Sequence, residues 1–107
     1  MRPEVKAFIE EYIRRFEQLD IKVGSLVLFG SQAKGTATIS SDVDIAVVMD
    51  EPLPPLDRGI LLSLGDEIDM RFETNLFFTT QKALNDATDI FDTNKYIRDE
   101  GVVLWRS

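Results

Sequence analysis

The sequence contains no cysteine and no histidine in its 107 residues. Without cysteine there can be neither a disulfide framework nor a thiolate metal site. Without histidine, zinc sites and the Ser/His and Cys/His catalytic pairs are also excluded. Any chemistry must therefore use carboxylates, hydroxyls, lysine or arginine side chains and the main chain.

Long hydrophobic runs and an excess of positive charge are also missing. No apolar stretch approaches the roughly 20 residues that cross a bilayer, and the N-terminal residues MRPEVKAFIEEY carry acids where a signal peptide is apolar. The formal net charge of −7 argues against broad nucleic-acid binding, which depends on lysine and arginine neutralising phosphates. We therefore expect a cytoplasmic protein without membrane contact, folded as a single domain over residues 1–107.

The pattern of apolar residues predicts an α/β (α+β) domain. An apolar stripe at helical spacing runs through residues 3–19. Short apolar or alternating runs predict strands at Ser25–Phe29, Val43–Met49 and 68–72, with a terminal strand or extended tail at 102–105. Further helices are expected at about 56–65, 80–87 and 90–100. Residues 31–40 are small and polar, which predicts a tight turn or one helical turn followed by a loop.

Two acids stand at the start of the very apolar strand 43–49, although aspartate is depleted from strands. Because side chains alternate faces, Asp42 and Asp44 project to one side, roughly 6 to 7 Å apart along the chain. The predicted strand 68–72 would bring Asp69 to the same face. Carboxylates this close repel unless a cation lies between them. Oxygen-only ligation suits Mg²⁺ or Mn²⁺.

A second feature lies directly after the first predicted strand. Gly30 leaves its main-chain N–H open to a nucleotide phosphate, Ser31 adds a hydroxyl donor, and Gly35 lets the loop fold back. A phosphate cradle beside a carboxylate metal site is the equipment for phosphoryl or nucleotidyl transfer.

The segment LFGSQAKGTATISSDVDIAVV, residues 28–48, resembles the signature of the DNA polymerase beta-type nucleotidyltransferase superfamily. The shared pattern is Gly-Ser, a spaced glycine, then Ser-Asp-x-Asp in a hydrophobic strand, and its form is most similar to the minimal nucleotidyltransferase branch. IDMRF around Asp69 and the ending YIRDEGVVLW also resemble this branch, so the similarity covers essentially the whole chain. Two positions depart from it, since many relatives have a basic residue in place of Gln32 and an aliphatic residue in place of Arg71.

The resemblance implies a nucleotidyltransferase fold, with a small mixed sheet and helices packed on one face, and a two-metal mechanism that transfers AMP from ATP to an acceptor hydroxyl. Asp42 and Asp44 would hold both Mg²⁺ ions and contact the nucleotide. Asp69 would hold the catalytic ion and lower the pKa of the acceptor hydroxyl. If the register of the third strand were different, Glu67 or Glu73 would be the third ligand instead.

The same resemblance assigns the phosphate contacts. Gly30 and Ser31 would hold the β and γ phosphates while pyrophosphate leaves. Lys34 and Arg71 are candidates for stabilising charge, with Lys34 counted among the nucleotide-binding residues.

Three hypotheses for the biological role stay open. The first is an antitoxin that AMPylates and silences a HEPN-type ribonuclease toxin, because relatives of this size commonly resemble the antitoxin half of such a two-protein system. Larger family members add a helical domain for substrate where this sequence ends, so we expect acceptor recognition to come from another chain. The second hypothesis is a small-molecule nucleotidyltransferase of the aminoglycoside type. The third is a catalytically silent antitoxin that neutralises its partner by contact.

Overall fold

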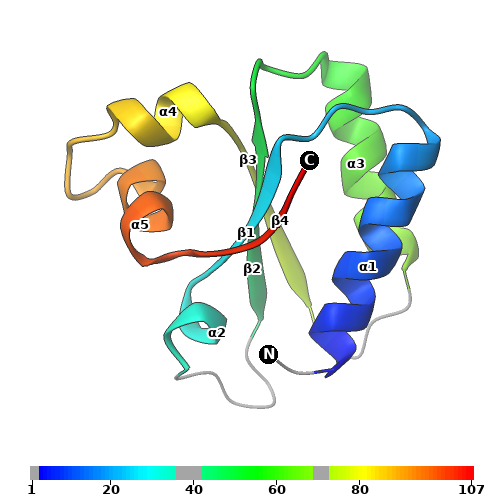
Figure 1. Ribbon diagram of the computed structural model, residues 1–107, viewed down its shortest axis with the longest axis horizontal. Helices are drawn as coiled ribbons and strands as arrows, with labels where there is room; N and C mark the ends of the chain where they lie inside the picture. The colour runs from blue at the N-terminus through cyan, green and yellow to red at the C-terminus, as the bar shows by residue number, and fades with distance from the viewer. Residues whose placement is uncertain (1–2, 36–41, 69–72) are drawn as a thin grey trace.

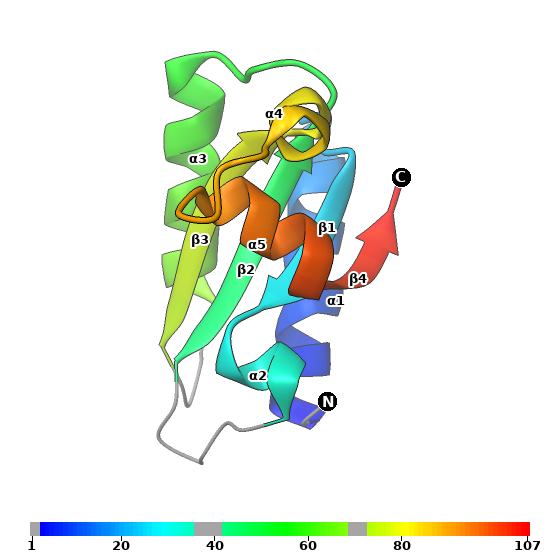
Figure 2. The same ribbon diagram turned by 90° about the vertical axis from the view of Figure 1, so that its left-hand side faces the viewer.

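A computed structural model describes residues 3–35, 42–68 and 73–107. Figures 1 and 2 show a mixed four-stranded sheet in the order β3-β2-β1-β4. Its strands are β1 (Ser25–Phe29), β2 (Val43–Met49), β3 (Thr74–Thr80) and β4 (Val102–Arg106). β1 is antiparallel to β2 and β4, whereas β2 and β3 are parallel. The end of β1 therefore meets the beginnings of β2 and β3 at one end of the sheet.

Helices cover both faces of this sheet (Figures 1 and 2). The five helices of the described residues are α1 (Pro3–Gln18), α2 (Ser31–Lys34), α3 (Pro55–Glu67), α4 (Gln81–Asp86) and α5 (Thr93–Glu100). α1 and α3 lie on one face and α4 and α5 on the other, while the short α2 lies beside the end of β1. The mixed sheet confirms the predicted fold class, but the expectation of helices on one face alone is wrong.

The face beneath α1 and α3 holds the larger core. The apolar stripe of α1 stacks aromatic rings, with Tyr12 and Phe16 centroids 5.5 Å apart and Phe16 5.4 Å from Trp105 of β4. The Tyr12 hydroxyl donates to the main-chain oxygen of Leu61 at 3.0 Å, which joins α1 to α3. Burial raises the pKa of Tyr12 above its ordinary value, so this hydroxyl stays a proton donor.

The face beneath α4 and α5 holds a smaller core. Its buried members are Val27, Ala46, Val48, Leu84 and Ile97. β1 and β2 thus carry apolar side chains on both faces, and a sheet covered on one side only would leave half of them in water. This is the physical reason for the second helical layer.

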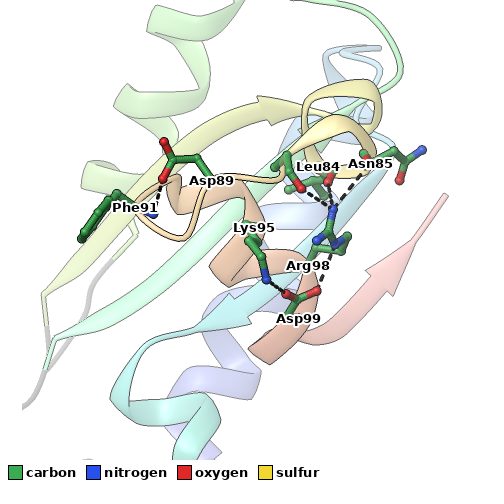
Figure 3. A network of polar contacts seen from close by, with 8 residues as sticks. Leu84, Asn85, Asp89, Phe91, Lys95, Arg98 and Asp99 are labelled. Atoms are coloured by element: carbon green, nitrogen blue, oxygen red, sulfur yellow. Dashed lines mark hydrogen bonds and ion pairs between the residues drawn. The ribbon is translucent and has the colours of Figure 1, made fainter.

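Polar contacts fix α4 against α5, as Figure 3 shows. The Arg98 guanidinium donates to the main-chain oxygens of Leu84 at 2.9 Å and of Ala87 at 2.8 Å. In the connecting loop, Asp89 accepts from the main-chain N–H of Phe91 at 2.8 Å, while the Phe91 side chain is 89% exposed. The second layer is therefore held by hydrogen bonds to its connection as well as by its small apolar core.

The third strand differs from the prediction. The described strand beside β2 is Thr74–Thr80, a run for which the sequence predicted no strand. Ile68 lies at the C-terminal cap of α3, and residues 69–72 lie outside the described part of the chain. The run TNLFFTT is rich in threonine and phenylalanine, but it does not alternate cleanly because its side chains pack toward both covered faces of the sheet.

Other boundaries differ by a few residues. α3 begins at Pro55, where proline suits the first helical position, and continues to Glu67. α5 begins at Thr93 rather than near residue 90, because the Asp92 carboxylate caps it by accepting from the Asn94 N–H at 2.8 Å. Within the described ranges, no helix is long and apolar enough to cross a membrane.

Candidate active site

The candidate site lies at the end of the sheet where β1 ends and β2 and β3 begin. In the strand register, Phe29 of β1 is opposite Asp44 of β2, and Asp44 is opposite Asn75 of β3. Gly30 follows β1 directly and leads into α2, whose place beside this end of the sheet is clear in Figure 2. Three chain segments that are distant in sequence thus meet here.

Asp42 and Asp44 lie on one face of the sheet, as their spacing predicts. Both carboxylates accept from the same amide nitrogen, Nδ2 of Asn75, at 3.4 Å for Asp42 and 3.0 Å for Asp44. Asp42 is exposed and Asp44 is half-buried. This face of β2 continues into the small core beneath α4 and α5, through Ala46 and Val48. The paired carboxylates therefore stand at the open end of a packed face.

Gly30 is in close contact with the second of these acids. Its main chain has φ 74° and ψ −152°, a conformation that L side chains rarely adopt. A β-carbon added at Gly30 would overlap the Asp44 carboxylate. The structure shows that this glycine makes room for Asp44. That it makes room for a phosphate stays a prediction.

The short helix α2 follows Gly30 directly. Ser31 is its first residue, and Gly35 ends it in the left-handed conformation with φ 73°. Lys34 places its ammonium 5.0 Å from the ring centroid of Tyr96 in α5, a cation–π contact. The side-chain nitrogen of Gln32 is buried and has no hydrogen-bond partner. Nucleotide contacts by Ser31 and Lys34 remain predictions.

The third predicted ligand is not placed by the structure, since Asp69 lies outside the described residues, as does Arg71. Of the two alternatives, Glu67 ends α3 and forms an ion pair with Arg15 of α1 at 3.6 Å, on the face away from the carboxylate pair. Glu73 is exposed directly before β3, where its main-chain oxygen accepts from the Val43 N–H at 2.8 Å.

Asn75 is the site residue that sequence reasoning missed. The signal was present, since Asn75 is the one amide in the threonine- and phenylalanine-rich run TNLFFTT. The alternating pattern predicts the third strand at 68–72, which makes TNLFFTT the segment between that strand and the next helix. Asn75 was therefore not considered as a residue of the sheet.

Comparison with known proteins assigns the chain to a family. The model of the nucleotidyltransferase domain family matches residues 9–98. The chain belongs to this family. A relative in sequence is the probable protein adenylyltransferase MntA of Haemophilus influenzae. It is 32% identical to this chain over 105 residues, which cover 83% of this chain and 86% of the relative.

Solved structures show the same nucleotidyltransferase fold. One is the crystal structure of a toxin–antitoxin with AMP-PNP, with a TM-score of 0.58 and 27% identity, covering 92% of this chain and 73% of that one. Another is a mutant of the toxin–antitoxin MntA–HpeT, with a TM-score of 0.58 and 23% identity, covering 99% of this chain and 75% of that one.

The donors of this nucleotidyltransferase domain suit a magnesium ion that arrives with its nucleotide. Among residues 3–35, 42–68 and 73–107, no group of three or more acids is placed to hold a metal ion. The described donors are therefore Asp42, Asp44 and the Asn75 amide. Mg²⁺ commonly takes one or two carboxylates and completes its coordination with water and substrate phosphates, so this donor set fits it.

Proposed function

We propose that this protein is an adenylyltransferase that moves AMP from ATP to a hydroxyl of a partner protein, and that the partner is a HEPN-type ribonuclease toxin. The proposal rests on one observation. Four residues lie together at one end of the sheet, namely Gly30, Asp42, Asp44 and Asn75. A glycine main chain against one of two adjacent carboxylates can accept a triphosphate and its cation together.

The proposed reaction needs few groups from the protein. The acceptor hydroxyl loses its proton to solvent as its oxygen attacks the α-phosphorus of ATP. The bond between the α-phosphorus and the oxygen that bridges to the β-phosphorus breaks, and pyrophosphate leaves with that electron pair. Mg²⁺ would neutralise the triphosphate and acidify the acceptor hydroxyl. Asp42 and Asp44 would hold it, with Asp69 as third ligand, while Gly30 and Ser31 hold the β and γ phosphates.

The relatives support a protein acceptor within a toxin–antitoxin pair. The Haemophilus influenzae relative is named a protein adenylyltransferase, and two of the fold neighbours are toxin–antitoxin structures, one of them with AMP-PNP. A protein acceptor also agrees with the net charge of −7, because such a chain does not attract nucleic acid on charge alone.

The test is incubation of the protein with labelled ATP, Mg²⁺ and a HEPN-type ribonuclease as candidate partner, followed by mass spectrometry. We expect one added AMP on a partner hydroxyl and loss of ribonuclease activity. Asp42→Asn combined with Asp44→Asn should lower transfer at least about a thousandfold, since both metal-binding carboxylates are gone. The same double variant should lose the rise in Tm that Mg²⁺ and ATP give the parent.

Two results would contradict the proposal. If the double variant silences the partner as well as the parent does, the protein acts by contact alone. If the parent releases pyrophosphate with aminoglycosides while the partner gains no AMP, the acceptor is a small molecule.

A further inference from the structure

The position in β3 opposite the carboxylate pair is occupied by an amide. Asn75 pairs with Asp44 in the register of β2 and β3 and donates to Asp42 and Asp44 through one nitrogen. Within the described residues, no lysine or arginine forms an ion pair with either acid. The Asn75 amide therefore bridges the two carboxylates through one nitrogen.

Two carboxylates on one strand face repel each other in the absence of a cation. An amide N–H donated to both reduces this repulsion and fixes the direction of each carboxylate. An acid at the same position would do the opposite, since it would add a third negative charge and increase the demand for a cation.

From this arrangement we propose that Asn75 is a positioning residue, which holds Asp42 and Asp44 at a spacing ready for the cation that enters with ATP. The proposal rests on the proposed function of this site as a metal–nucleotide site. Because the amide is neutral, the pair binds the cation less tightly than it would with an acid at position 75, so that cation and nucleotide enter and leave together.

The metal-free arm measures Tm in EDTA. We expect Asn75→Ala to lower Tm by about 4 °C in the parent, through the loss of one hydrogen-bonded group beside two charges. In the Asp42→Asn, Asp44→Asn background the same change should shift Tm by less than about 1 °C, because the repulsion is already gone. The matched control is Asn85→Ala, since the Asn85 side chain accepts a hydrogen bond from Gln81 of the same helix, at 2.9 Å, and is not part of the carboxylate site.

The metal arm measures Mn²⁺ binding with a non-hydrolysable ATP analogue, by the electron paramagnetic resonance signal of free Mn²⁺. Asn75→Ala should weaken Mn²⁺ binding about tenfold, a usual effect of losing the group that orients metal ligands. Asn75→Asp should strengthen it about tenfold, because an added carboxylate raises the negative charge of the site. Saturating Mn²⁺ and analogue should restore most of the Tm that Asn75→Ala loses in EDTA.

A purely structural asparagine gives a different pattern. Equal losses of Tm with and without Mn²⁺, equal losses in the two backgrounds, or unchanged Mn²⁺ affinity in Asn75→Asp would each overturn the proposal. Neither the Tm measurement nor the Mn²⁺ measurement contains an acceptor protein. If the labelled-ATP assay shows no AMP transfer, the proposed function is refuted, but the Tm and Mn²⁺ results still test the role of Asn75. If the parent binds no Mn²⁺ with the analogue, the site is not a metal site and both proposals fail.

Discussion

The two faces of the sheet share the same strands but differ in what they bury. Beneath α1 and α3 lies a continuous core with stacked aromatic rings and a buried tyrosine hydroxyl that is hydrogen-bonded. Beneath α4 and α5 the core has five buried residues, and toward α2 it gives way to Asp42, Asp44 and Asn75. The difference indicates that one face provides most of the stability and the other carries the polar site.

This division has a physical basis in β2. Alternate residues of one strand point to opposite faces, so Val43, Ile45 and Val47 enter the large core while Asp42 and Asp44 face the other way. The apolar half anchors the strand, and the polar half is positioned by it. Substitutions on the two faces should therefore separate stability from chemistry.

The largest expected effect on stability is at Phe16. Its side chain is 1% exposed and contacts the rings of Tyr12 and Trp105. Phe16→Ala should lower the free energy of unfolding by about 3 to 5 kcal/mol through the cavity it leaves, as measured by urea denaturation. Nucleotide affinity of the molecules that remain folded should not change, because the site is on the other face.

The matched control for Phe16 is Phe91, which is 89% exposed in the connection between α4 and α5. Phe91→Ala should change the free energy of unfolding by no more than about 0.5 kcal/mol. If Phe16→Ala weakens nucleotide binding below its unfolding transition, the two faces are coupled and the division is wrong.

The sequence predicted the large core better than the rest of the fold. The apolar stripe of α1 and the apolar runs of β1 and β2 are strong local patterns, and all three are confirmed. The second helical layer was missed, because a short helix can pack on either face and neither α4 nor α5 shows in its sequence which one it covers.

At the site, the pairing of Asp42 with Asp44 follows from strand alternation alone and is confirmed as a shared face. Asn75 depends on which segment pairs with β2, and that is a tertiary fact. The alternating residues 68–72 gave the clearer strand pattern in the sequence. Thr74–Thr80, the parallel partner of β2, is covered on both faces and so lacks a clean alternation.

The next expected effect is the activity of Asp69→Asn. The described strand beside β2 is Thr74–Thr80, and Asp69 lies outside the described residues. The role of Asp69 therefore rests on the resemblance of IDMRF to the family pattern. We predict that Asp69→Asn keeps the fold and binds ATP through Asp42 and Asp44, yet loses transfer about a hundredfold. This equals about 2.7 kcal/mol of transition-state stabilisation, and the labelled-ATP assay measures it.

Two matched variants make this assay decisive. Glu67→Gln should keep full activity, because Glu67 is paired with Arg15 on the other face. Glu73→Gln should also keep it if Asp69 is the third ligand. Full activity in Asp69→Asn together with loss in Glu73→Gln would place the third ligand directly before β3 instead.

The smallest expected effect is at Glu11, on the outer surface of α1. Its carboxylate accepts from Arg14 at 2.5 Å and from Arg15 at 2.8 Å, and these hydrogen bonds, that of Arg14 first, lower the pKa of Glu11 to about 2. Because the folded pKa lies below the unfolded value, the carboxylate stabilises the fold above the ordinary pKa of 4.5 and this contribution is lost as the pH falls toward about 2. Glu11→Gln should therefore lower Tm slightly at neutral pH, and by much less than Phe16→Ala does. The difference in Tm between parent and Glu11→Gln should shrink in high salt, because exposed ion pairs are screened. Thermal unfolding of parent and variant across this pH range measures it, and a difference that grows on acidification would show that the pair does not act as described.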